Sequence, residues 1–301
     1  MAVVSHLSAG KDCFSSMSLC VFMYHRILPS PHPEAVALPQ FQHQLDFLQK
    51  HFDILTPNEV FDYIHNGKVP RKNRNYAALT FDDGWADNLF YATDELKKRG
   101  LQAMMAVSAG FAHKGEIRSG LEESALRRPT EAAAAAARAG NPENYLSEDE
   151  LKYLISTGVW SLENHGVRHY LGSKRKSVLA APQGEEKEAF LEKLRIDILS
   201  SRAYLDELTG RRGRIFFWPY GHYSTPAAEV VQECGYDIQF SVYKGACRPK
   251  DKRLVLPRIG VSRCKKLHKN SFVFSHAILE KLHGLFHVEQ VCFDDFYQDE
   301  E

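Results

Sequence analysis

Three short groups in the sequence hold the residue types that metal-assisted hydrolysis requires. Asp82 and Asp83 follow an apolar run, His165 and His169 are separated by three residues, and Trp218–Gly221 follows another apolar run. Two imidazoles and a carboxylate suit a divalent metal such as zinc, and they leave coordination positions open for water and substrate. Adjacent aspartates at a strand end project in different directions, so one can bind the metal while the other acts as general base.

Each group alone has a simpler explanation. An Asp-Asp-Gly sequence is commonly a turn, because these residues favour turn geometry. Two histidines at this spacing can arise by chance in a chain with 14 histidines. An aromatic and proline turn can simply be rigid. The three groups together are more specific, because each follows a predicted strand, and the carboxyl ends of parallel strands meet at one edge.

Alternating strand and helix patterns position these groups. Apolar runs predict strands near 19–24, 77–81, 101–107, 159–162, 215–218, 237–242 and 254–261. Amphipathic spacing and capping residues predict helices over about 39–51, from Thr56, before Gly100, and over 147–158, 186–208 and 225–234. Residues 110–146 interrupt the alternation, and we expect an insertion that covers one face. The repeated order of strand and helix is typical of a parallel α/β sheet or barrel with one core.

Composition narrows the function classes. The 301 residues carry 38 Lys and Arg against 38 Asp and Glu, with a pI near 7.2, so no overall field favours nucleic acid or an anionic membrane as partner. No apolar stretch approaches the roughly 20 residues of a transmembrane helix. The six scattered cysteines form no C-x-x-C pair, which favours reduced thiols. The N-terminus shows no secretory signal, so we expect a cytoplasmic protein; the sequence predicts no oligomeric state.

The motifs together resemble a known family. Thr80–Gly84, His165–His169 and Pro219–Gly221, in this order, resemble the polysaccharide deacetylases, also called NodB-homology or carbohydrate esterase family 4 proteins. The extension Trp85–Asn88 also fits, and Phe22–Ile27 is similar to the branch of biofilm poly-N-acetylglucosamine deacetylases. The resemblance implies a distorted (β/α) barrel of about seven parallel strands with an inserted segment near 110–146. It divides the chain into an N-terminal extension (1–19), a catalytic domain (20–262) and a C-terminal tail (263–301).

The resemblance also implies roles for single residues. Asp82 would be the general base, and Asp83, His165 and His169 would hold the metal. Zn²⁺ is the first choice for that metal, with Co²⁺ or Ni²⁺ as alternatives. Water at the metal would attack the acetamide carbonyl, and the metal and the backbone N–H of Tyr220 would stabilise the oxyanion.

The general acid has two alternatives. In the common family pattern, a histidine late in the chain protonates the departing amine. In the biofilm branch, an N-terminal histidine has this role, which makes His25 the candidate here. The tail histidines His276, His283 and His287 remain the alternative.

The sequence departs from the family before Pro219. Phe217 and Trp218 stand where the family usually has an arginine that orients the catalytic aspartate. Arg258 is either a substitute for that arginine or an ordinary surface residue. The side chains of Trp218, Pro219 and Tyr220, with Arg258, are the candidate substrate contacts; the two aromatic rings either stack on a sugar or fill the barrel mouth.

These observations predict a metal-dependent hydrolase that removes the N-acetyl group of a sugar in a polysaccharide or glycan precursor. An N-acetylated glycan is therefore the expected partner, and the family resemblance leaves the cell envelope as the alternative location to the cytoplasm. Two alternatives remain: a hydrolase of a different, non-sugar C–N bond, and a catalytically silent relative that only binds glycans.

Overall fold

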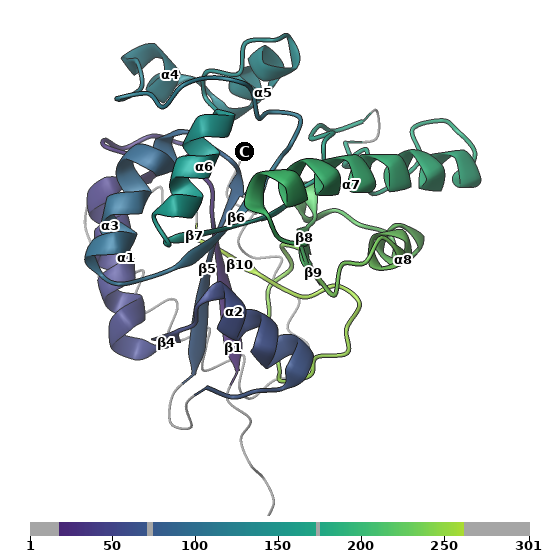
Figure 1. Ribbon diagram of the computed structural model, residues 1–301, viewed down its shortest axis with the longest axis horizontal. Helices are drawn as coiled ribbons and strands as arrows, with labels where there is room; N and C mark the ends of the chain where they lie inside the picture. Colours follow the sequence, from purple (N-terminus) through teal and green to yellow (C-terminus); the bar gives the residue numbers. More distant parts are fainter. Residues whose placement is uncertain (1–17, 71–74, 173–174, 262–301) are drawn as a thin grey trace, which may run out of the picture.

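A curled sheet of seven parallel strands forms a half-barrel in the described part of the chain, as Figure 1 shows. The computed structural model describes residues 18–70, 75–172 and 175–261. In sheet order the strands are β10 (Ile259–Gly260), β1 (Leu19–Tyr24), β5 (Tyr76–Asp83), β6 (Ala103–Val107), β7 (Trp160–Asn164), β8 (Ile215–Phe217) and β9 (Ile238–Phe240). The short β4 (Asp53–Ile54) also pairs with β5, and β2 (Ile27–Leu28) pairs separately with β3 (Val36–Ala37). The predicted distorted barrel is confirmed.

The half-barrel is nearly closed by the chain that precedes β10. Leu256 donates its backbone N–H to Gln239 and accepts from the N–H of Ser241, which attaches this segment to β9. The chain then pairs with β1, where Ile259 lies opposite Phe22. This closure brings the end of the described chain next to β1 and β5, so residues distant in sequence can share a site.

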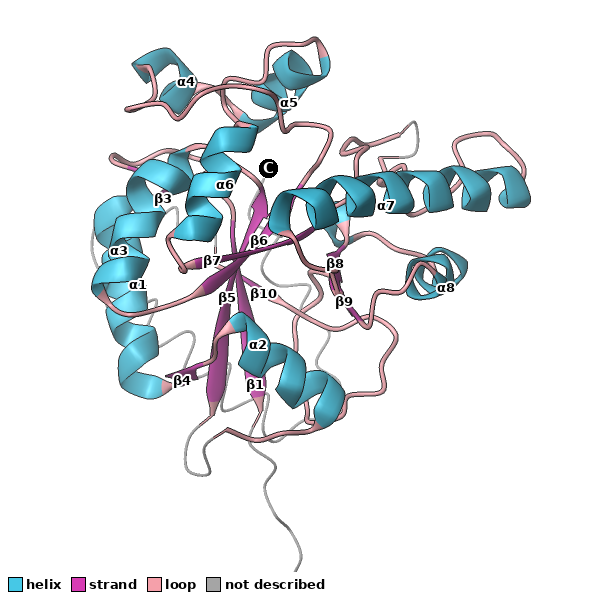
Figure 2. Ribbon diagram, viewed as in Figure 1, coloured by secondary structure: helices cyan, strands magenta, loops and turns pink. Residues whose placement is uncertain are grey.

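Helices cover the outside of the curled sheet, as Figure 2 shows. The helices of the described chain are α1 (Leu38–His51), α2 (Pro57–Phe61), α3 (Thr93–Lys98), α4 (Glu123–Arg127), α5 (Thr130–Arg138), α6 (Glu148–Ser156), α7 (Lys187–Thr209) and α8 (Thr225–Glu233). Of these, α2 packs against the inner apolar side chains of the barrel, and α4 and α5 belong to the inserted segment. The described chain also contains two π-helical segments, η1 (Asp62–Asn66) and η2 (Asn88–Ala92), and a 3-10 turn, η3 (Pro219–Gly221). Thr56 and Ser147 begin α2 and α6 with complete capping boxes, as the sequence predicts.

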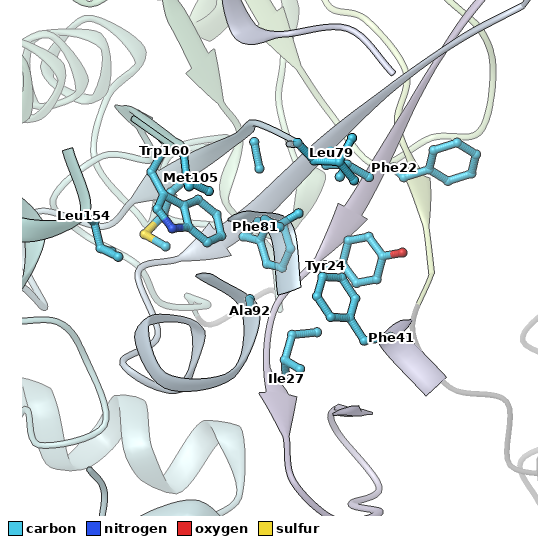
Figure 3. Packing of buried hydrophobic residues seen from close by; sticks show 14 of the residues in the cluster. Phe22, Tyr24, Ile27, Phe41, Leu79, Phe81, Ala92, Met105, Leu154 and Trp160 are labelled. Carbon is cyan, nitrogen blue, oxygen red and sulfur yellow. The ribbon is translucent and has the colours of Figure 1, made fainter. Parts of the chain in front are cut away.

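Apolar side chains pack on both faces of the sheet. Figure 3 shows the outer cluster, where Phe81 stacks on Tyr24 and meets the edge of Trp160. Alternate residues of the same strands, such as Val21 and Ala78, point into the barrel. Burial of each large apolar side chain stabilises the fold by about 2 kcal/mol. The alternation also sends Asp82 to the inner face of β5 and Asp83 to the other.

The inserted segment carries α4 and α5 and lies beyond the end of the sheet toward which β5 and β6 point, at the top of Figure 1. It forms a small apolar cluster with the turn after β5. That cluster comprises Trp85, Phe111, Ala133, Ala134, Ala137 and Tyr145. The insertion therefore covers the edge where the predicted site residues end their strands.

Further sequence expectations concern cysteines, membranes and domain limits. Cys20, Cys234 and Cys247, the cysteines within the described ranges, are buried free thiols, and burial raises the pKa of Cys20 to about 12. No helix among the described residues is long and apolar enough to cross a bilayer. The cytoplasmic location and the domain limits stay predictions, and most of 1–19 and all of 263–301 lie outside the described residues.

A buried ion pair anchors the insertion to α6. Glu150 is fully buried and accepts hydrogen bonds from Arg118 at 2.6 and 2.8 Å and from the N–H of Ser147 at 2.9 Å. Burial acts to raise the pKa of Glu150, but these bonds outweigh it and hold the pKa below its ordinary value of 4.5. The carboxylate therefore stabilises the folded state above about pH 4.5, and this stabilisation is lost as the pH falls through the lower, folded-state pKa.

We expect Glu150→Gln to lower the free energy of unfolding by about 2 kcal/mol at pH 7, because Arg118 loses its charged partner. The difference from the wild type should shrink as the pH falls below 4.5. Urea unfolding at pH 7 and at acidic pH measures both effects. Glu123→Gln is the control, because Glu123 and its partner Arg127 are exposed, and it should change stability little. An equal loss for Glu150→Gln at both pH values would contradict the assignment.

Candidate active site

Asp83, His165 and His169 converge at the carboxyl ends of β5 and β7. One ligand atom from each residue lies within 4.8 Å of the other two, and all three residues are buried. Asp83 Oδ1 lies 3.0 Å from His169 Nε2 and 3.3 Å from His165 Nε2. The structure thus brings together the three side chains that the sequence proposes as metal ligands.

The hydrogen bond at the far side of His165 tests whether these residues fit a metal. His165 Nδ1 lies 2.7 Å from the carbonyl oxygen of Phe217. A carbonyl only accepts, so Nδ1 carries the proton, and in the neutral ring Nε2 presents a lone pair toward the Asp83 carboxylate. Two acceptors that face each other need a cation between them. Such an outer hydrogen bond on a metal-ligating histidine is also the common way in which its ring is oriented.

Two aromatic side chains pack against His169 and orient its imidazole ring. Tyr220 stacks on it with ring centres 4.6 Å apart, and Phe111 meets it edge-on at 5.6 Å. His169 Nδ1 is buried and has no hydrogen-bond partner within the described residues. The aromatic packing, which includes a residue of the insertion, therefore fixes the direction of Nε2.

Asp83 has an unusual backbone conformation. Its φ of 77° lies in the left-handed region, and Gly84 follows with a φ of 80°. A non-glycine residue in this region stores strain that the surroundings must offset, and such residues cluster at functional sites. Trp85 Nε1 donates to Asp83 Oδ2 at 2.9 Å, which leaves Oδ1 directed at the imidazoles. Burial acts to raise the pKa of Asp83, but when the imidazoles carry protons in place of a metal, they outweigh burial and hold the pKa well below its ordinary value.

Asp82 forms a separate pair with Arg258. The guanidinium nitrogens lie 2.6 and 2.7 Å from the two carboxylate oxygens, and Thr80 accepts a further bond from the same arginine at 3.1 Å. Arg258 is fully buried, so it is neither a surface residue nor open to a substrate. Burial acts to raise the pKa of Asp82, but the charge of Arg258 outweighs it and the pKa is lowered. The burial of Arg258 contradicts the expected substrate contact and fits the alternative, in which Arg258 substitutes for the arginine that orients the catalytic aspartate.

The aromatic turn after β8 divides into buried and accessible parts. Trp218 is fully buried, donates its Nε1–H to Gln239 at 3.0 Å and packs in the core, so a sugar cannot stack on it. Pro219 is buried as well. Tyr220 is partly exposed, with a left-handed φ of 58°, and burial raises its pKa to about 12. Of the two rings, only Tyr220 remains available to a ligand, which corrects the expectation for Trp218.

His25 directly follows β1 and is partly exposed. Tyr24 lies opposite Phe81 in the pairing of β1 with β5, which places His25 beside the end of β5 that carries Asp82 and Asp83. Asn88 Nδ2 donates to the backbone carbonyl of His25 at 2.8 Å. The alternative general acids, at positions 276, 283 and 287, lie outside the described residues.

Sequence reasoning missed the residues that hold the His165–His169 loop. Asp197 of α7 accepts the backbone N–H groups of Val167 at 2.8 Å and Arg168 at 3.1 Å. Asn164 Oδ1 accepts the N–H of Gly166 at 2.6 Å. A polar residue inside a long charged helix gives no local signal of such a role. Asn164, which immediately precedes His165 at a strand end, gave the only usable signal.

A parallel half-barrel with an Asp-His-His cluster and a second, separately held aspartate at one edge is an arrangement suited to hydrolysis. The family model for polysaccharide deacetylases matches residues 70–239, and the chain belongs to this family, whose members remove acetyl groups from sugar polymers. The matched region contains the Asp-His-His cluster and Asp82. His25 and Arg258 lie outside it.

Similar proteins agree with this assignment. A poly-β-1,6-N-acetyl-D-glucosamine N-deacetylase of Staphylococcus aureus is 27% identical over 237 residues, covering 76% of this chain and 68% of its own. The structure of IcaB from Ammonifex degensii aligns with a TM-score of 0.65 and 24% identity over 82% of this chain and 92% of its own. The Streptococcus pyogenes deacetylase PplD, in complex with acetate, aligns with a TM-score of 0.60 and 21% identity over 82% and 93%. The two structural likenesses show the fold.

We expect the chain to bind a single zinc ion at Asp83, His165 and His169. Isothermal titration of metal-stripped protein with zinc measures this. Asp83→Ala and His165→Ala should each weaken binding at least about 100-fold, because each removes one of three ligands. Asp82→Asn is the matched control and should bind zinc nearly as the wild type does, because Arg258 holds that carboxylate. Unchanged binding in Asp83→Ala would contradict the site.

Proposed function

We propose that this chain is a metal-dependent N-deacetylase of a glycan built from N-acetylated glucosamine. The observation that carries the proposal is the separation of the two adjacent aspartates. Asp83 faces two imidazole nitrogens, whereas both carboxylate oxygens of Asp82 accept hydrogen bonds from the buried Arg258. The similarity to the S. aureus enzyme supports a β-1,6-linked polymer of N-acetylglucosamine as the substrate class.

Each residue has a role that its surroundings allow. Asp83, His165 and His169 would hold the metal, most simply Zn²⁺. A divalent metal bound there supplies the Lewis acidity that polarises a carbonyl and makes water acidic enough for a weak base. Asp82 is ionised at neutral pH because Arg258 lowers its pKa, so it is ready to accept a proton from the attacking water.

The remaining steps concern the acetamide. The backbone N–H of Tyr220 would donate to the oxygen that becomes negative as the carbonyl is attacked. His25 would then donate a proton to the departing amine, since an amine leaves readily only when it is protonated. The ring of Tyr220, partly exposed beside His169, gives the sugar an apolar surface.

The structure weighs against a catalytically silent glycan-binding protein. A protein that only binds has no need for a strained metal ligand, and a second buried carboxylate is costly unless it is used or well paired. A non-sugar amide remains chemically possible at the same residues. The acetate-release assay below includes such an amide to separate the two substrates.

We expect the purified protein with zinc, cobalt or nickel to release acetate from β-1,6-linked oligomers of N-acetylglucosamine. Asp82→Asn should lose activity at least about 1000-fold, because the variant keeps the shape of the side chain but cannot accept the proton. Asp46→Asn, at an exposed ion pair, is the control and should remain active. Acetate release only from non-sugar amides would overturn the substrate assignment, and full activity in Asp82→Asn would overturn the mechanism.

Arg258 should set the acidic limb of the pH profile. In Arg258→Met, burial acts on Asp82 without the opposing charge, so the pKa of Asp82 rises and the base becomes protonated at higher pH. We expect the acidic limb of kcat/KM to move to higher pH, and activity at neutral pH to fall about 10- to 100-fold. Arg258→Lys should move the limb less, because it keeps the charge. An unmoved limb in a folded Arg258→Met protein would show that Arg258 does not control the base.

A further inference from the structure

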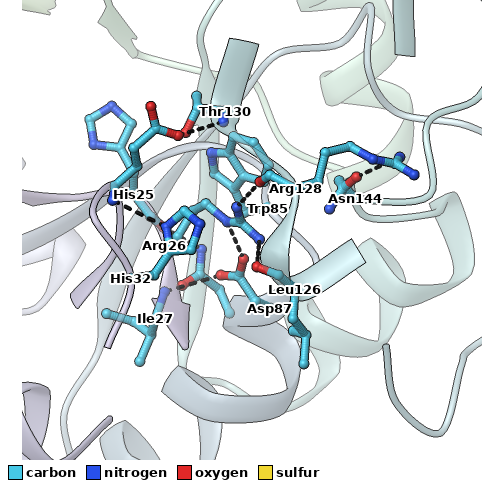
Figure 4. A network of polar contacts seen from close by, with 12 residues as sticks. His25, Arg26, Ile27, His32, Trp85, Asp87, Leu126, Arg128, Thr130 and Asn144 are labelled. Atoms are coloured by element: carbon cyan, nitrogen blue, oxygen red, sulfur yellow. Dashed lines mark hydrogen bonds and ion pairs between the residues drawn. The ribbon is translucent and has the colours of Figure 1, made fainter. Parts of the chain in front are cut away.

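One buried arginine, Arg26, directly follows His25 and binds the inserted segment, as Figure 4 shows. Arg26 is 1% exposed. Its Nη1 donates to the carbonyl of Arg128 at 2.8 Å, and its Nη2 donates to the carbonyls of Leu126 at 3.2 Å and Ala125 at 3.3 Å. These carbonyls lie in the last turn of α4 and the residue after it. A single guanidinium thus binds three backbone carbonyls at the end of one short helix of the insertion.

The same arginine binds the turn that follows the candidate metal ligand. Its Nε donates to Asp87 Oδ2 at 2.9 Å, and its guanidinium lies 4.6 Å from the ring centre of Trp85. Trp85 in turn donates to Asp83 at 2.9 Å. Arg26 therefore touches the insertion on one side and the Asp83 turn on the other.

Side chains of that turn hold the backbone at His25 and just after it. Asp87 Oδ1 accepts the N–H of Ile27 at 3.1 Å, and Asn88 Nδ2 donates to the carbonyl of His25 at 2.8 Å. The position of His25 relative to Asp83 is thus set by bonds between two short segments. Arg26 contacts both segments and the insertion, alongside the backbone pairing of Trp85 with Tyr145.

Two further contacts tie the loop after β1 to the insertion. Glu34 Oε2 accepts the N–H of Thr130 at 2.6 Å, and His32 Nε2 lies 3.4 Å from the carbonyl of Arg127. The loop that begins at His25 therefore contacts the insertion at several positions along its length. These outer contacts are more exposed, whereas Arg26 is buried and charged, so its bonds are the costly ones to break.

On the basis of the proposed function, we propose that Arg26 is a positioning residue that couples the inserted segment to His25 and so places His25 to protonate the departing amine. If the insertion moves away, Arg26 loses three carbonyl acceptors and keeps only its ion pair with Asp87 and its contact with Trp85. The docked insertion and the placed His25 are therefore favoured together.

The simpler alternative is that Arg26 only fastens the insertion. Arg118 provides the comparison, because it also donates to carbonyls of the insertion, those of Glu143 and Tyr145, and also pairs with a buried glutamate, Glu150. The hydrogen bonds of Arg118 go to residues 143, 145 and 150 and not to residues 25–27 or 83–88. Removal of either arginine should loosen the insertion, but only removal of Arg26 should displace His25.

An amide and an ester substrate separate these two roles. Hydrolysis of the N-acetyl glycan requires protonation of an amine, whereas an aryl acetate such as 4-methylumbelliferyl acetate releases an aryl oxide that leaves unprotonated. In Arg26→Met we expect kcat for the glycan to fall about 10- to 100-fold, since a displacement of about 1 Å can cost this much. Hydrolysis of the aryl acetate should change less than about threefold, because the other groups stay in place.

The matched variants complete the comparison. His25→Ala should show the same loss on the glycan alone, and Arg26→Lys should lie between the wild type and Arg26→Met. Arg118→Met should change the two substrates by the same factor. Equal losses on both substrates in Arg26→Met, or no loss on the glycan, would overturn the inference. If Arg26→Met does not fold, Arg26→Lys and Asp87→Asn provide the same test.

Hydrogen exchange in metal-free protein gives a readout that needs no activity. The Ile27 amide should exchange faster in Arg26→Met than in the wild type, and at the wild-type rate in Arg118→Met. Unchanged exchange at Ile27 in Arg26→Met would overturn the coupling. A wild-type protein that releases no acetate from any glycan would instead overturn the proposed function, so the two failures are distinguishable.

Discussion

Two adjacent carboxylates at the end of one buried strand repel each other unless each has its own compensating partner. Much of the structure around the site supplies these partners. Asp82 and Asp83 are both buried, and like charges in a medium of low dielectric repel strongly. The alternation of the strand sends Asp82 into the barrel, where Arg258 meets it. The left-handed backbone of Asp83 turns the other carboxylate toward the imidazoles. Each charge thus receives its own compensation, and the pair can take different chemical roles.

This arrangement depends on closure of the barrel. Arg258 lies 176 residues after Asp82 and reaches it only because the segment before β10 attaches to β9 and then to β1. The cost of burying a guanidinium is offset by a bidentate pair, by Thr80 and by the ring of Phe217 at 4.7 Å. Phe217 also supplies the carbonyl that orients His165. One residue of β8 therefore contacts both halves of the site.

Local sequence patterns predicted the strands, the capped helices and the Asp-His-His cluster, because these features depend on residues near one another or on the shared edge of a parallel sheet. The partner of Asp82 could not be settled from the sequence, since no arginine directly precedes Pro219 and the burial of Arg258 depends on how the barrel closes. The burial of Trp218 depends on Gln239 of the neighbouring strand, which no local pattern contains. For the same reason, Arg26 gave no signal: its acceptors are backbone carbonyls of a segment about 100 residues away.

The pairing of charges around the site bears on what it can recognise. Among the described residues, Asp82 is matched by Arg258, Asp87 by Arg26 and Asp197 by Arg168, each within hydrogen-bond distance. A charged substrate would have to break such a pair to gain a partner, and breaking a buried pair is strongly unfavourable. Tyr220 and backbone groups remain for recognition, and both suit a neutral sugar ring with its hydroxyl and acetamide groups. These three pairs therefore serve to hold the reacting groups, and the proposed substrate, an uncharged acetylated glycan, needs none of them as a partner.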